Sequence, residues 1–242
     1  MADETATYRW RLPLKGRNPD EAHRAATPLE LFFDLVFVVA IAQAAAGLHH
    51  GIAEDHVADA IVDFMLAFFA IWWAWMSFTW FASMYDNNDV PYRLLVFLQL
   101  TGAVILAAGV SRVFEDRDLS LMLAGYIVMR VAMVAQAWRA GQHNPTERVA
   151  ERRSATSLIV LQALWVALVV VAPKAWIIPG ALVLGTSELV ASAWSNTKRN
   201  KRFWHQEHIA ERYGLLTIIV LGETLLAASL ALDATFEAGE FE

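Results

Sequence analysis

Two carboxylates inside a hydrophobic segment near the amino terminus are the side chains best placed to do chemistry. Glu30 and Asp34 fall within the apolar run 29–48, and a helix of about 20 apolar residues is long enough to cross a bilayer. A charge in hydrocarbon costs roughly 2.5–3.5 kcal/mol even on lenient insertion scales. Because the two carboxylates are four residues apart, they share one helix face and can share a partner. The pattern therefore indicates polar chemistry inside a membrane.

Further ionisable residues occur in the later apolar segments, at depths that decide how much explanation each needs. Asp63 and Glu211 lie near segment ends, where a charged side chain can reach water. Glu223 lies near the middle of the last apolar segment, with no nearby interface, and is the strongest candidate for a proton or cation carrier. It should be either protonated or held by a partner. The candidates for a polar binding interior are Glu30, Asp34, Arg130, Glu188, His208, Glu211, Arg212 and Glu223.

The spacing of these charges also predicts which helices meet. Arg212 and Glu223 are eleven residues apart, so with His208 they form one stripe that should face the protein interior. Gly214 and Gly222 would let a neighbouring helix approach that segment closely. Glu30 and Asp34 need a cation at a similar depth, which Arg212 could supply, with Arg130 as the next candidate. The first and last segments are therefore expected to be neighbours. The structural alternative is that all these charges form ion pairs that only fix helix positions.

The elements that must position these residues are membrane-spanning helices. Hydrophobic residues make up 57% of the 242-residue chain and the mean hydropathy is +0.39, with the apolar residues in long blocks, which is too apolar for an ordinary soluble domain. Strands are excluded because an open sheet edge cannot face lipid and barrel-like alternation is missing. The sequence predicts an all-α transmembrane bundle of about seven spanning helices. These are expected at 29–48, 58–83, 91–110, 119–138, 155–172, 176–194 and 208–232.

The distribution of Lys and Arg predicts how the bundle is oriented. Seven spans place fourteen of these cations on the amino-terminal side and three on the other, which puts the amino terminus in the cytoplasm by the positive-inside rule. The first group is Arg9, Arg11, Lys15, Arg17, Arg24, Arg93, Arg139, Arg148, Arg152, Arg153, Lys198, Arg199, Lys201 and Arg202; the second is Arg112, Arg117 and Lys174.

The chain divides into a cytoplasmic tail at 1–27, a helical membrane domain at 28–232 and an acidic, non-cytoplasmic tail at 233–242. The first 27 residues lack the apolar core of a cleavable signal peptide, so the first span is expected to act as the insertion signal. Cysteine is absent, and no cofactor motif or metal-ligand spacing is recognisable. The bilayer is the expected partner, together with a small solute or ion, and no nucleic acid is expected.

The second segment carries an unusual run of tryptophans, Trp72-Trp73-Ala74-Trp75, followed by Trp80. Trp72 and Trp73 lie near the middle of the segment, where an interfacial belt alone would not place them. Packing in the bundle core is the favoured interpretation. The sharper one is an aromatic wall that lines a cavity.

Three motifs together resemble a known bacterial family. Thr27-Pro28-Leu29-Glu30-Leu31-Phe32-Phe33-Asp34-Leu35-Val36-Phe37-Val38 is similar to the opening signature of the low temperature requirement protein A family. The tryptophan run, and His208-Ile209-Ala210-Glu211-Arg212-Tyr213-Gly214-Leu215 continuing to Gly222-Glu223, resemble its later motifs. The resemblance implies a multi-pass protein of the bacterial inner membrane. It implies no mechanism, because the family is named for a growth phenotype. Family members are usually longer, so it also implies either a minimal form of the family or a truncated one, with 233–242 as the candidate truncation point.

Three function classes follow from the buried charges. The leading hypothesis is transport or sensing of a small solute or ion through the buried carboxylates. A membrane-embedded enzyme acting on a lipid or head group would need the same carboxylates gathered around its substrate. A scaffold without turnover would use them only as ion pairs. Carboxylates converging on a cavity would favour the first two classes, and the chain is more simply read as a non-enzyme.

Overall fold

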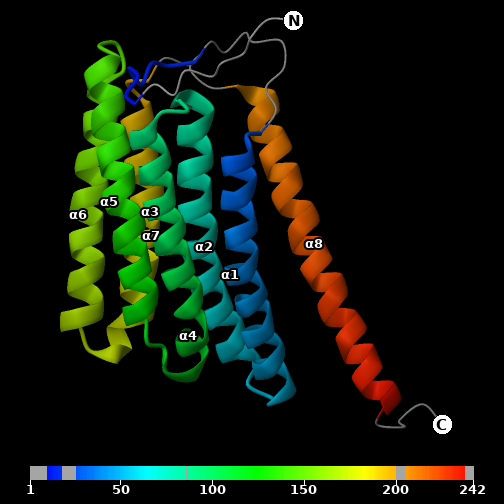
Figure 1. The fold of residues 1–242 in the computed structure, drawn as a ribbon. Coiled ribbons are helices and arrows are strands. Elements are labelled where there is room, and N and C mark those ends of the chain that lie inside the picture. Colours follow the sequence, from blue (N-terminus) through cyan, green and yellow to red (C-terminus); the bar gives the residue numbers. More distant parts are fainter. Residues whose placement is uncertain (1–9, 18–25, 86, 200–204, 238–242) are drawn as a thin grey trace, which may run out of the picture.

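The computed structural model describes residues 10–17, 26–85, 87–199 and 205–237 (Figure 1). Over these ranges the chain is helical and contains no strand, which confirms the all-α fold. The helices are α1 (Pro28–Ala53), α2 (Val57–Tyr85), α3 (Val90–Ala108), α4 (Val110–Asp116), α5 (Ser120–His143), α6 (Arg148–Val171), α7 (Ile177–Asn196) and α8 (Gln206–Glu237), with a 3-10 turn, η1, at Lys174–Trp176.

The helices run antiparallel in chain order and form one bundle (Figure 1). α5 packs between α3 and α6, α1 packs on α2 and α3, and α7 packs on α6. α8 contacts α1 and α2 through its first turns and then diverges from them. Each of the seven predicted spans corresponds to a helix, with α3 and α4 together forming the third. Among the residues whose side chains the structure describes, six of the seven are long and apolar enough to cross a membrane. The seventh is α8, whose carboxyl-terminal side chains lie outside those residues.

Several helices extend beyond the predicted spans, for example α1 to Ala53 and α5 to His143. Two other differences have identifiable reasons. The third span bends at Gly109, where a Cβ atom would lie 2.5 Å from the Met122 backbone nitrogen, so the close approach of α5 explains the break. α6 begins at Arg148 rather than near residue 155. Its charged first turns were predicted as loop, but they continue the helix beyond the apolar region.

The start of α1 is defined by its sequence. Pro28 occupies the first turn, where its missing N–H costs nothing. The Thr27 hydroxyl accepts a hydrogen bond from the Glu30 backbone N–H at 3.3 Å, and the Thr27 N–H donates to Glu30 Oε2 at 2.7 Å. This capping box fixes the helix register. Glu30 and Asp34 consequently point toward the bundle interior, and each is 1% exposed.

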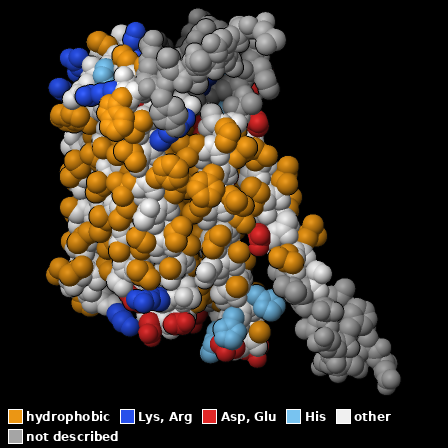
Figure 2. Space-filling view, viewed as in Figure 1, with side chains coloured by type: hydrophobic (Ala, Val, Ile, Leu, Met, Phe, Trp, Pro, Cys, Tyr) orange, Lys and Arg blue, Asp and Glu red, His pale blue; other side chains and the backbone are white. Residues whose placement is uncertain are grey.

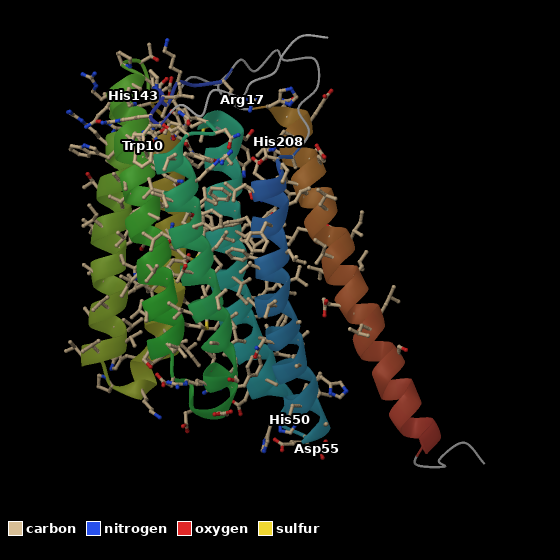
Figure 3. All side chains as sticks on the ribbon, viewed as in Figure 1. Trp10, Arg17, His50, Asp55, His143 and His208 are labelled. Atoms are coloured by element: carbon tan, nitrogen blue, oxygen red, sulfur yellow. The ribbon has the colours of Figure 1, made fainter. Side chains whose placement is uncertain are left out.

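Part of the predicted tail is docked on the bundle. Residues 10–17, here called the N-terminal strap, cross the end of the molecule that carries His143 (Figure 3). Leu14 is fully buried. The Leu12 N–H donates to Asp89 at 2.8 Å, and the Gly16 N–H donates to Asn144 at 2.8 Å. Residues 1–9 and 18–25 of that predicted tail, and 238–242 of the acidic one, lie outside the described residues.

One close helix crossing was not predicted. At the contact between α3 and α5, a Cβ atom on Gly125 would lie 2.4 Å from the Gly102 carbonyl oxygen and 2.4 Å from the Leu106 nitrogen. The expected close approach at Gly214 and Gly222 is wrong, since nothing described lies within 4 Å of a Cβ atom at either position. Glycine therefore permits a close helix approach at the α3–α5 crossing and not on α8.

The surface has the pattern of a membrane protein. Hydrophobic side chains cover the middle of the face seen in Figure 2, and charged side chains gather mostly at its two ends. Val131, Leu182 and Val170 are among the large apolar residues that are more than half exposed. An exposed apolar surface of this extent is typical of a region that contacts a membrane or another protein. The predicted orientation of the bundle relative to the cytoplasm stays a prediction.

Thiol labelling tests that orientation because the native chain has no cysteine. Thr146→Cys, in the turn between α5 and α6, and Asp55→Cys, in the turn between α1 and α2, lie at opposite ends of the bundle. A membrane-impermeant maleimide should label Asp55→Cys in intact cells and Thr146→Cys only in inverted vesicles. Labelling of both from one side would contradict the seven-helix arrangement.

Candidate functional site

The first and last helices meet through a buried ion-pair cluster, as predicted. The α1–α8 cluster comprises Glu30, Asp34, Trp75, His208 and Arg212. Arg212 binds both oxygens of Asp34, through Nη2 to Oδ1 and through Nε to Oδ2 at 3.2 Å. The Trp75 indole N–H donates to Asp34 Oδ1 at 2.6 Å. Arg212 Nη1 also lies 3.8 Å from Glu30 Oε1.

The α1–α8 cluster is buried and links the first turns of α1 and α8. Arg212 and His208 are fully buried, and Figure 3 shows His208 where α8 passes the start of α1. His208 Nε2 lies 3.3 Å from Glu30 Oε1. Glu30 therefore uses one oxygen for the cap of α1 and the other for α8. All polar groups face protein, and the cluster lines neither of the two cavities described below.

Arg130 and Glu188 form a second, separate cluster deeper in the bundle. Arg130 Nη2 on α5 lies 2.6 Å from Glu188 Oε2 on α7. Trp73 donates its indole N–H to the same oxygen, and Trp165 donates to Glu188 Oε1 at 3.1 Å. The Tyr126 hydroxyl accepts from Arg130 at 2.9 Å. These five residues are called the midspan cluster, and they join helices α2, α5, α6 and α7.

A cavity of about 860 Å³ extends from the midspan cluster toward the end of the bundle that carries the N-terminal strap. Its wall contains aromatic side chains from α2 and α8, namely Trp72, Trp73, Trp80 and Tyr213. The favoured packing interpretation of the tryptophan run was therefore incomplete, because three of its indoles line a cavity and two donate hydrogen bonds to buried carboxylates. Serines from α6 and α7 also line the cavity: Ser154, Ser157, Ser192 and Ser195.

A third ion pair lines the same cavity near the strap end. Arg199, after α7, lies 2.7 Å from Glu151 on α6. The Tyr85 hydroxyl donates to the same Glu151 oxygen at 2.8 Å. Both Glu151 and Arg199 line the cavity. The cavity is thus bounded by one arginine–glutamate pair at each end.

On the far side of the midspan cluster lies a small apolar pocket of about 60 Å³. Leu66, Phe69, Leu123 and Ala181 line it, and so does Glu188. Glu188 therefore belongs to the walls of both the large cavity and the small pocket. Phe69 packs closely against α7 because position 185 is glycine, where a Cβ atom would lie 3.1 Å from the ring.

Two further ionic groups sit at the ends of the bundle. Burial alone would raise the pKa of Asp89, but hydrogen bonds from Arg139 and from the Leu12 and Tyr92 backbone N–H groups together hold that pKa below its usual range. At the other end, Arg117 Nε lies 2.7 Å from Asp63 Oδ1. Asp63 was expected to reach water, but it is 4% exposed and satisfied by that arginine instead.

Two predicted interior residues on α8 lie elsewhere. Glu211 is exposed, because the buried face of the first turns is set by His208, Ile209, Arg212 and Leu216, and Glu211 points away from it. Glu223 is half-buried. No hydrogen bond or ion pair joins Glu223 to another described residue. The stripe expected on α8 therefore does not bring Glu223 to a described partner, although Val220, three residues before it, still packs against the core.

Several residues of the site were missed from the sequence. Glu151 and Arg199 were counted only as loop or end charges. A signal was present for Glu151, because it lies four residues before Ala155, the first residue of the predicted span, and so on the same helix face. Trp165 carried no such signal, since its partner Glu188 comes from another helix. Tyr126 lies four residues before its partner Arg130 on the same helix, a spacing that was overlooked.

Comparisons with known proteins agree with the sequence motifs. A family model described as bacterial low temperature requirement A protein (LtrA) matches residues 25–241. An uncharacterized protein of Rhizobium meliloti (strain 1021) is 30% identical over 224 residues, covering 88% of this chain and 52% of that protein. The chain thus spans about half of that relative's length. No solved structure matches the chain.

Proposed function

The chain belongs to the bacterial low temperature requirement A family, and from that premise we propose that it moves a small solute across the bacterial inner membrane. The solute would enter the large cavity from the strap end. The midspan cluster would form the barrier, and the small apolar pocket would lie on the exit side. In this proposal Arg130 and Glu188 act on the solute.

The observation that carries the proposal is the position of Glu188 in both walls. A scaffold needs no cavity of about 860 Å³, and buried charges in membrane helices usually face one another or a water-filled path. An ion pair between two cavities can open by exchanging partners, whereas a packed apolar plug cannot. The α1–α8 cluster lines neither cavity, so we assign it to holding α8. Glu211 and Glu223 are given no part in the path.

Access of charged reagents to introduced thiols tests this pathway without knowledge of the solute. Ser192→Cys places a thiol in the large cavity, and Ala181→Cys places one in the small pocket. A membrane-impermeant methanethiosulfonate should modify Ser192→Cys from the strap side only, and Ala181→Cys should not react from that side. In an Arg130→Gln/Glu188→Gln background, Ala181→Cys should become reactive from the strap side, because the ionic barrier is gone.

Val131→Cys is the matched control, since Val131 lies beside Arg130 in sequence but is 58% exposed on the lipid-facing surface. A thiol in hydrocarbon reacts poorly with a charged reagent. Equal rates at Ser192→Cys and Val131→Cys would refute a water-accessible cavity. Rapid modification of Ala181→Cys from the strap side in the otherwise native chain would refute the barrier.

A further inference from the structure

We propose that the solute held in the large cavity is a small organic anion, a carboxylate attached to a flat apolar body. This inference rests on the proposed function and specifies its substrate class. It follows from the hydrogen-bonding capacity that the cavity wall leaves unused, from its aromatic surface, and from the charge of the surrounding face.

The unused capacity at the deep end belongs to Arg130. A guanidinium has five N–H donors, and both hydrogen bonds of Arg130 are made by Nη2, to Tyr126 and to Glu188. Its Nε and Nη1 groups have no hydrogen-bond partner among the described residues. Glu188, by contrast, accepts from Arg130, Trp73 and Trp165. The deep end therefore offers donors, while its carboxylate is already satisfied.

The strap end of the cavity has a similar surplus. Arg199 uses Nε for Asn196 and Nη1 for Glu151, which leaves Nη2 without a described partner. Glu151 keeps one oxygen without a described partner, but Arg199 neutralises its charge. Between the two ends, the Ser195 hydroxyl is 1% exposed and makes no hydrogen bond within the described part of the chain. It is free to donate to a ligand in the cavity.

The aromatic surface of the cavity and the positive charge around its strap end also favour an anion with a flat apolar body. Trp72 and Trp80 present flat apolar surface, on which an aromatic or conjugated body can stack. The helix ends and turns around the strap side carry most of the cations of the chain, including Arg148, Arg152 and Lys198. Such a face attracts anions and repels organic cations. A cation would moreover meet two carboxylates that arginines already neutralise.

Binding to three probes that share one phenylpropenyl body tests the ligand class. The purified protein in lipid nanodiscs is titrated with trans-cinnamate, with its neutral amide, cinnamamide, and with cinnamylamine, and binding is followed by calorimetry and tryptophan fluorescence. Cinnamate should bind at least about tenfold more tightly than the amide, as expected for a hydrogen bond to a charged group. Cinnamylamine should bind most weakly.

Variants locate the site. Arg130→Gln/Glu188→Gln keeps the cavity neutral and should remove the preference for the acid over the amide. Trp72→Leu should weaken all three probes by about threefold to tenfold, as expected for a lost aromatic contact. Arg152→Gln, an exposed cation outside the cavity lining, should leave the order of the probes unchanged.

The outcomes separate this inference from the proposed function. Tighter binding of the amide or the amine than of cinnamate would overturn the anion assignment while leaving the cavity as a solute site. Failure of all three probes, with Ser192→Cys still reactive from the strap side, would also overturn it. Failure of all three probes together with an unreactive Ser192→Cys would overturn the proposed function as well.

Discussion

Arg212→Met is expected to lower the free energy of unfolding by about 3–5 kcal/mol, the usual cost of removing one partner from a buried ion pair. Asp34 would remain 1% exposed with only Trp75 as a donor, and Glu30 would lose its nearest guanidinium. The carboxylates cannot reach water from this position. Unfolding in mixed detergent micelles, followed by tryptophan fluorescence, measures the change.

Two comparisons show whether the charge is responsible. Adding Asp34→Leu and Glu30→Gln to Arg212→Met removes the unpaired charges and should restore most of the lost stability, because a buried ion pair and an apolar replacement are often similar in free energy. Arg152→Met, at an exposed position, should cost less than about 1 kcal/mol. A loss below about 1 kcal/mol for Arg212→Met would mean that the α1–α8 cluster does not hold α8.

Gly125→Ala is expected to destabilise the protein by about 1–3 kcal/mol, the range for overpacking a filled interior. The added methyl group would meet the Gly102 carbonyl oxygen and the Leu106 backbone nitrogen at 2.4 Å. Backbone atoms cannot rotate away as a flexible side chain can, so α3 and α5 must separate. The same detergent unfolding measurement reports the effect.

Gly214→Ala provides the matched control on another helix. Nothing described lies within 4 Å of the added atom, and alanine is better than glycine in a helix interior by up to about 1 kcal/mol. This variant should be neutral or stabilised. Equal losses at both positions would show that helix propensity, and not the α3–α5 contact, determines the cost at Gly125.

The fold was largely predictable because lipid leaves few choices. Apolar length and the alternation of cation-rich turns are local properties, and each predicted span has a corresponding helix. The bend at Gly109 and the early start of α6 were not predictable in this way. Both depend on contacts from α5 or on charged turns that continue beyond the apolar region, and no window of the sequence contains that information.

The site was predictable only where the free-energy cost of an unpaired charge in the membrane required a partner. Asp34 and Arg212 each needed a partner of opposite charge, and in the structure they form an ion pair with each other. The pairing of Arg130 with Glu188 was not assigned beforehand, because several carboxylates lay at similar depths. Glu223 shows the limit of this reasoning. Its depth was estimated from helix position alone, and the departure of α8 from the bundle makes its surroundings a tertiary property.

The pairing of Asp34 with Arg212 has a consequence for biosynthesis. The two residues are 178 positions apart in the chain, which at ribosomal rates is roughly 10–35 s of synthesis. The first helix therefore enters the membrane long before its cation exists. During that interval Glu30 and Asp34 must be protonated, be held near the interface, or be sheltered by the insertion machinery. Helix α8 then supplies the cation that pairs with Asp34, so the charge of the first helix is balanced only after the helices between them have been inserted.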